Sequence, residues 1–156
     1  TIKTTIDEAI SLAQSIVLSK GIDYIFDIAG DVPVQIIGDR HRYSQILLNL
    51  IVQASQYTYV SGQSDENQML IRLHRIPVET STIMLRVEIS NKAIRLPKGF
   101  RENLNNNKNT MINDEIALNF ILPQQLIALM GGKLDVIDEK ENGAMFWFEI
   151  PATIVE

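Results

Sequence analysis

The chain has 156 residues, no cysteine and a net charge of −5, from 14 Lys and Arg against 19 Asp and Glu. The lack of cysteine excludes disulfides and thiolate metal sites, and the acidic balance argues against a nucleic-acid surface, which needs a basic face. The length suits a single domain, and no apolar run approaches the ~18 residues of a membrane span. Because the first residue is Thr1 rather than Met, we expect residues 1–156 to be one domain excised from a longer protein.

The first predicted element is an amphipathic helix over residues 4–18. Its apolar residues recur three and four positions apart, which is the spacing of one helix face. Thr4 or Thr5 is expected to cap it, and Lys20-Gly21 is expected to end it.

Two short strands and a second helix are predicted next. Residues 22–28 and 34–37 are rich in Ile and Val, which is typical of strands. Asp39 is expected to cap a helix that ends near Tyr57. A stripe close to the 3.6-residue period predicts the buried face of this helix: Tyr43, Ile46, Leu47, Leu50, Ile51, Ala54 and Tyr57.

The middle of the chain predicts a pair of strands followed by a loop. In residues 68–77 and 82–91, apolar and polar side chains alternate, so each strand should bury one face and leave the other largely polar. Residues 98–115 contain six asparagines and are predicted to be a loop.

The C-terminal part predicts a helix and a hairpin. The helix should begin near Phe120 to Leu122, because Pro123 fits only a first helical turn, and Gly131-Gly132 should end it. Residues 133–138 and 144–150 are expected to pair as the hairpin. Together, these elements predict an α+β fold, a two-layer sandwich with a mixed sheet and helices on one face.

Three patches along the chain resemble the ATP-binding domain of sensor histidine kinases, the GHKL or Bergerat fold. The first runs from Val32-Pro33 to Thr58 and includes the helix that carries the family's N box. The second is the strand 83–89 leading to Ile94 and Leu96-Pro97. The third runs from residue 126 through the Leu-Met-Gly-Gly helix end to the final strand at Pro151. The resemblance therefore covers nearly the whole chain.

The adenine-binding box of that family is altered in this chain. The resemblance implies that Asn91 stands where the family has an aspartate that accepts a bond from the adenine amino group. An asparagine can still accept this bond, but the charge-assisted part, worth roughly 1–2 kcal/mol, is lost. Ala93 and Arg95 stand where the family has glycines, and Arg95 would bring a long side chain into nucleotide space unless the chain bends outward.

The phosphate and metal positions are altered as well. Ala117 and Asn119 match the two glycines of a box that lets backbone N–H groups cradle phosphates. Gln53 replaces the asparagine that holds Mg²⁺, and Gln56 replaces a common lysine. Only Tyr57 keeps an expected role, stacking on adenine. Three lost contacts of about 1.5 kcal/mol each would weaken ATP binding by roughly 10³-fold or more.

Other polar residues that could suggest chemistry have simpler explanations. Asn49 lies one helical turn before Gln53 and is expected to bond a neighbouring backbone. His41 and His74 are each followed by Arg, whereas the phosphoacceptor histidine is followed by an acidic residue, so both are expected to be exposed polar residues. No nucleophile elbow, HExxH motif or P-loop is present, so we predict no catalytic residue and no metal site, with Gln53 a ligand only if Mg²⁺ binds.

The leading hypothesis is a degenerate histidine-kinase-like domain of a two-component signalling protein, a pseudokinase that binds no cofactor. Its partner would be a protein such as a receiver domain or a second kinase-like chain, in the cytoplasm, with membrane attachment only through other parts of the parent. One alternative is a divergent domain that still binds Mg-ATP through Gln53, Tyr57 and Asn91. Another is a small-molecule sensor that reuses the emptied pocket, lined by residues such as Ile94, Phe120 and Leu122.

Overall fold

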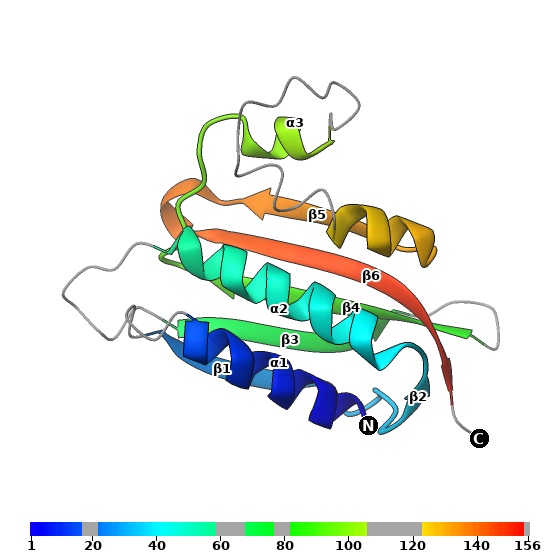
Figure 1. The fold of residues 1–156 in the computed structure, drawn as a ribbon. Coiled ribbons are helices and arrows are strands. Elements are labelled where there is room, and N and C mark those ends of the chain that lie inside the picture. The colour runs from blue at the N-terminus through cyan, green and yellow to red at the C-terminus, as the bar shows by residue number, and fades with distance from the viewer. Residues whose placement is uncertain (17–21, 59–67, 77–81, 106–122, 155–156) are drawn as a thin grey trace.

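The chain folds into a mixed six-stranded sheet with helices packed on one face, which confirms the predicted α+β sandwich (Figure 1). A computed structural model describes residues 1–16, 22–58, 68–76, 82–105 and 123–154. Within these ranges, every helix is too short or too polar to cross a lipid bilayer.

The sheet has one parallel and several antiparallel pairings. Its order is β1-β3-β4-β6-β2, and β5 also pairs with β6. Among the described strands, only β1 and β3 pair in parallel. The strands are β1 (Asp23–Ile28), β2 (Ile36–Ile37), β3 (Gln68–Ile76), β4 (Thr82–Asn91), β5 (Lys133–Asp138) and β6 (Ala144–Ile154).

Helices α1 (Ile2–Ile16) and α2 (Arg40–Gln56) lie side by side across one face of the sheet (Figure 1). α1 begins earlier than predicted, because Thr1 is the capping residue: its Oγ1 accepts a bond of 3.2 Å from the backbone N–H of Thr4. Thr4 and Thr5, the caps predicted from the sequence, are therefore inside the first turn. The predicted stop at Lys20-Gly21 lies outside the described residues.

α2 follows its prediction closely. Asp39 is the N-cap, and its Oδ1 accepts a bond of 3.3 Å from the N–H of Arg42. Tyr57 is the C-cap. The predicted stripe faces the sheet, with Ile46, Leu47, Leu50, Ile51 and Ala54 buried and both tyrosines half-buried.

A short helix, α3 (Phe100–Asn105), occupies part of the segment that was predicted to be a loop. The prediction was wrong there because it relied on the polar composition of the segment. It gave too little weight to Phe100 and Leu104, two apolar residues at helical spacing. Phe100 and Leu104 are 6% and 2% exposed, and the ring of Phe100 packs edge-on against Tyr57 and Phe146 at centroid distances of 5.4 and 6.0 Å.

The end of the C-terminal helix and the hairpin are confirmed, with one extension, whereas the predicted helix start near Phe120 to Leu122 lies outside the described residues. Residues 123–129 are helical, and Gly131 ends the helix with a φ of +85°. β5 and β6 are joined by the 3-10 turn η3 (Lys140–Asn142). β6 runs four residues past the predicted end at Ile150, because residues 151–153 continue the pairing with β4 and residues 153–154 pair with β2.

The two faces of the sheet differ in character. The inward face of β3, β4 and β6 carries Ile, Leu, Val and Phe side chains that pack under α1 and α2. On the outward face, Arg86 donates to Glu88 at 3.0 Å and to Glu149 at 3.1 Å, and its guanidinium lies 4.3 Å from the ring centroid of Trp147. This outward network keeps charged side chains paired where the helices do not cover the sheet.

Candidate functional site

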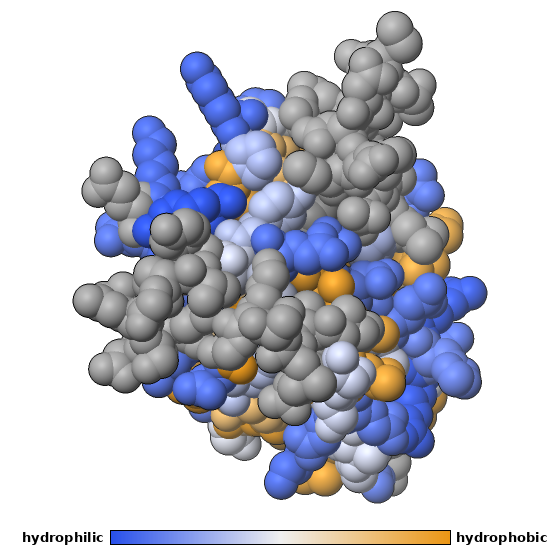
Figure 2. Space-filling view, turned by 60° about the vertical axis from the view of Figure 1, so that its left-hand side comes forward, coloured by the Kyte–Doolittle hydropathy of each residue, from blue (hydrophilic) through white to orange (hydrophobic). Residues whose placement is uncertain are grey.

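The described motif positions come together where α2 ends. The residues just after α2 pair with the segment that follows β4: Thr58 and Ile94 form an antiparallel bridge, and the N–H of Arg95 donates to the carbonyl of Tyr57 at 2.9 Å. This pairing places Gln53 and Gln56 on the last turns of α2 next to the Asn91–Arg95 segment. Figure 2 brings the side of the molecule on the left of Figure 1, where α2 ends, toward the viewer.

Asn91 forms part of the turn that leaves β4. The residue is 4% exposed, and its Oδ1 accepts a bond of 3.0 Å from the N–H of Ala93. Its backbone carbonyl accepts a second bond, of 3.2 Å, from the N–H of Ile94. This is the local side-chain-to-backbone pattern by which Asn and Asp shape turns. The oxygen that the resemblance assigns to adenine therefore already holds the turn together.

Arg95 folds back on its own turn. Its side chain is exposed, and Nη1 donates to the carbonyl of Lys92 at 2.7 Å and to that of Ile94 at 2.9 Å. Ile94, which was expected to line a small-molecule pocket, is fully buried. The other residues expected in that pocket, Phe120 and Leu122, lie outside the described residues.

The residues on α2 are oriented differently from one another. Gln53 is half-buried, and its Oε1 is closed to solvent with no hydrogen-bond partner among the described residues. Gln56 is exposed. The ring of Tyr57 is half-buried and packs edge-on against Phe100 at an interplanar angle of 73°. Asn49, further back on the helix, is half-buried.

At the position where the family holds its metal ion, the side-chain oxygen of Gln53 is closed to solvent. Mg²⁺ keeps several waters and needs near-ideal octahedral geometry, which a solvent-closed amide oxygen such as that of Gln53 does not offer. In the described ranges, no three His, Cys, Asp or Glu side chains gather as a metal site. Ala117 and Asn119, the altered phosphate-box positions, lie outside the described residues.

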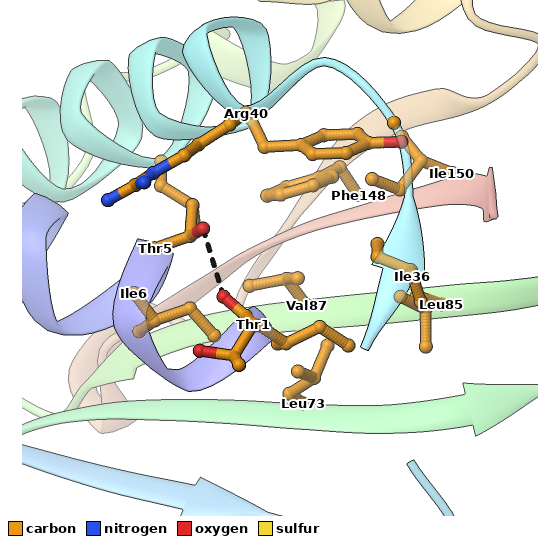
Figure 3. A pocket seen from close by; sticks show the side chains of 14 residues that line it. Thr1, Thr5, Ile6, Ile36, Arg40, Leu73, Leu85, Val87, Phe148 and Ile150 are labelled. Carbon is orange, nitrogen blue, oxygen red and sulfur yellow. Dashed lines mark hydrogen bonds between the residues drawn. The ribbon is translucent and has the colours of Figure 1, made fainter. Parts of the chain in front are cut away.

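The residues at the opposite end of α2 enclose a cavity that sequence reasoning missed. It has a volume of about 110 Å³ and lies between the first turn of α1, β2, the start of α2 and the sheet (Figure 3). Gly38 shapes one wall, since a Cβ there would lie 2.2 Å from the hydroxyl oxygen of Tyr43. Burial raises the pKa of the Tyr43 phenol, and the Asp39 carboxylate raises that pKa further.

This cavity could not be predicted from local pattern. Its walls come from separate elements that meet only in the fold, although Tyr43 and Leu47 were predicted on the buried stripe of α2. The one local signal is Gly38 before a helix cap, which allows a ring to pack close to the backbone.

The sequence is similar to those of curated histidine kinases, although no protein-family model matches it. It is 25% identical over 155 residues to the signal transduction histidine-protein kinase BarA of Escherichia coli (strain K12), which covers 96% of this chain and 16% of BarA. It is 25% identical over 142 residues to the sensory/regulatory protein RpfC of Xanthomonas campestris, covering 86% of this chain and 19% of RpfC. The chain thus spans less than a fifth of the length of these relatives.

Solved structures of histidine kinases share the fold. Full-length ShkA, in complex with AMPPNP, superposes with a TM-score of 0.77 at 23% identity, covering 99% of this chain and 31% of that one. The nucleotide-free catalytic domain of ThkA superposes with a TM-score of 0.68 at 24% identity, covering 99% and 96%. The resemblance indicated by the sequence is therefore confirmed: the chain is a histidine-kinase-related, GHKL-like domain of two-component systems.

Proposed function

We propose that this domain is a pseudokinase module, in which the former nucleotide site has become structural and signalling proceeds through protein contacts. The observation that carries the proposal is the bond from the Ala93 N–H to Asn91 Oδ1. It commits to the turn one of the two lone pairs of the oxygen that would accept the adenine amino group. The solvent-closed Oε1 of Gln53 adds support from the metal side of the same site.

The six altered positions favour this proposal over a divergent but working kinase domain. They fall in each nucleotide-binding box while the core and the helix ends are retained: Gln53, Asn91, Ala93, Arg95, Ala117 and Asn119. Full-length ShkA was solved with AMPPNP, so the shared fold is compatible with a nucleotide in that relative. The altered residues, rather than the fold, argue against Mg-ATP here.

The partner we propose is a receiver domain or a second kinase-like chain, met in the cytoplasm. In the view of Figure 2, hydrophobic residues drawn in colour form small separate areas among hydrophilic ones. A contact made through the coloured residues of this side would be largely polar, so we expect it to weaken with ionic strength. Sedimentation velocity of the chain alone and with a receiver domain, at low and high salt, would measure both partnerships.

The decisive test of the proposal is titration of Mg-ATP and Mg-ADP, followed by calorimetry and backbone amide shifts. We expect no saturable heat and no shift at Gln53, Tyr57 or Asn91 up to millimolar nucleotide. Micromolar binding that ADP displaces would overturn the proposal, and would make the domain a working ATP-binding unit.

A restored variant is the matched control for that titration. It carries the family residues at six altered positions: Gln53→Asn, Asn91→Asp, Ala93→Gly, Arg95→Gly, Ala117→Gly and Asn119→Gly. We expect it to gain nucleotide affinity by about 10³-fold if the altered residues, and not the rest of the fold, prevent binding. Equal, weak binding by both chains would place the defect elsewhere.

A further inference from the structure

We infer that the cavity at the start of α2 binds a small amphipathic molecule, a short aliphatic carboxylate of about four to six carbons. The inference goes beyond the pseudokinase proposal and does not depend on it. The cavity lies at the N-terminal end of α2, whereas Gln53, Tyr57 and the Asn91 turn lie at the C-terminal end (Figures 1 and 3).

The inner walls of the cavity are entirely aliphatic or aromatic. They come from α1, β3, β4 and β6, and each of their side chains is at most 5% exposed: Ile6, Leu73, Leu85, Val87, Phe148 and Ile150. Leu85 pairs with Ile150 and Val87 pairs with Phe148 across the sheet, so the wall is a continuous apolar surface. A water placed there would find no polar partners, and apolar cavities of this kind stay dry until an apolar ligand enters.

The volume limits the size of the tail. Protein interiors hold few voids larger than one water, and a cavity of about 150 Å³ with similar walls takes a benzene molecule. The cavity of about 110 Å³ is somewhat smaller, which suits a short, unbranched hydrocarbon chain rather than a ring system or a long lipid.

Apart from the Tyr43 hydroxyl beside Gly38, the polar side chains that line the cavity gather at its mouth. Thr1, Thr5 and Arg40 line the cavity there, and Arg40 is exposed, so the cavity reaches the surface beside Arg40 (Figure 3). The Oγ1 of Thr5 donates to the backbone carbonyl of Thr1 at 3.2 Å. Arg40 forms an ion pair with Glu8, one helical turn beyond Thr5.

This mouth favours a carboxylate head group. A guanidinium presents five N–H donors in a planar fork that matches a carboxylate, and one donor is used by Glu8. A ligand carboxylate would share Arg40 with Glu8 at a site where the Arg40 side chain is 59% exposed, so the head group should add only about three- to tenfold in affinity. The tail should supply the rest, at about fourfold per buried methylene.

The test is a chain-length titration on the 156-residue chain with labelled methyl groups. Butyrate, hexanoate, octanoate and 1-hexanol are the probes, and xenon reports on whether the cavity is accessible. We expect saturable shifts of the Ile6, Leu85 and Val87 methyls, with affinity rising about fourfold per methylene to hexanoate and little further to octanoate. Hexanoate should bind about three- to tenfold more tightly than hexanol.

Three variants separate the tail from the head group. Val87→Phe, or Ile6→Phe if the first does not fold, fills the cavity and should abolish the methyl shifts. Arg40→Gln should weaken hexanoate about three- to tenfold and leave hexanol unchanged. Arg42→Gln is the matched control, because Arg42 lies on the same helix, is similarly exposed and pairs with Asp39.

Three outcomes would contradict parts of this inference. Xenon binding without hexanoate binding would overturn the carboxylate assignment, and methyl shifts that do not depend on chain length would overturn the tail assignment. If Arg40→Gln and Arg42→Gln lost the same hexanoate affinity, the effect would come from the overall charge and not from a contact of Arg40 with the head group. These readouts are methyl shifts at one end of α2, so they are independent of any nucleotide titration at the other end.

Discussion

The Oδ1 of Asn91 accepts a bond of 3.0 Å from the N–H of Ala93, at a position only 4% exposed to solvent. Without this acceptor, the Ala93 N–H would lose its partner at the edge of the core. We therefore expect Asn91→Ala to lower the free energy of unfolding by about 1–2 kcal/mol, measured by urea denaturation.

Asn142→Ala is the control for this substitution. Asn142 is exposed on the η3 turn, and its bond to Glu139 is made by the backbone N–H, which alanine keeps. Asn142→Ala should lower the free energy of unfolding by no more than about 0.5 kcal/mol. If both variants lost the same amount, the side chain of Asn91 would not be supporting its turn.

Gln53 makes the second prediction, because its buried Oε1 has no partner among the described residues. An unsatisfied buried acceptor costs stability, and Leu has similar volume and similar helix propensity. We expect Gln53→Leu to raise the free energy of unfolding by about 1 kcal/mol.

Gln56→Leu, on the same helix, is the comparison. Gln56 is exposed and already takes part in an interaction, so its replacement should give no gain. A loss of stability in Gln53→Leu would mean that the amide is satisfied, and the argument from its isolation would be wrong.

Local sequence patterns indicate which face of a helix or strand is buried, and this decides how much of the fold could be predicted. The stripe on α2 and the alternation in β3 and β4 report burial directly, so those elements were predicted with nearly correct ends. The end of β6 was missed because Pro151 normally terminates a strand. One edge of β6 pairs with β5 as far as Glu149 and with β2 from Thr153 onward. Pro151 lies between these two residues, where this edge has no described partner.

The sequence named the positions of the candidate site but not their geometry. Comparison with the family motif indicated which positions had changed, including Asn91 and Gln53. It could not indicate that Asn91 would form its own turn or that Arg95 would fold back on Lys92, since both depend on the path of the backbone after β4. The cavity at Gly38 was beyond local pattern for the same reason.

Tyr43 predicts how stability depends on alkaline pH. Burial, and then the Asp39 carboxylate, raises the pKa of its phenol above the usual 10.0. The folded state therefore keeps this proton more tightly than the unfolded state. Its contribution to stability is complete below pH 10 and is lost as pH rises through the raised pKa.

The measurement is the urea midpoint at several pH values on either side of 10, for the chain and for Tyr43→Phe. We expect the midpoint of the chain to fall more steeply above that pH than the midpoint of Tyr43→Phe, which has no phenol proton to lose. Asp39→Asn should bring the phenolate absorbance transition of Tyr43 to lower pH. Parallel midpoint curves for the chain and Tyr43→Phe would contradict the raised pKa.

Arg86 makes the last prediction, because it holds two carboxylates on the outward face of the sheet. It lies 3.0 Å from Glu88 and 3.1 Å from Glu149, and the three side chains are 20%, 14% and 15% exposed. Removing the guanidinium would leave two poorly solvated carboxylates facing each other and would also remove its contact with Trp147. We expect Arg86→Met to lower the free energy of unfolding by about 2–3 kcal/mol, measured by urea denaturation.

The matched control is Arg72→Met on the neighbouring strand. Arg72 lies 3.8 Å from Asp27, and both side chains are more than half exposed, at 56% and 60%, so water screens the pair. Arg72→Met should lower the free energy of unfolding by no more than about 0.5 kcal/mol. Adding Glu88→Gln and Glu149→Gln to Arg86→Met should recover part of the lost stability, because the repulsion between the carboxylates is removed. Equal losses in Arg86→Met and Arg72→Met would show that the outward network contributes no more than an exposed ion pair.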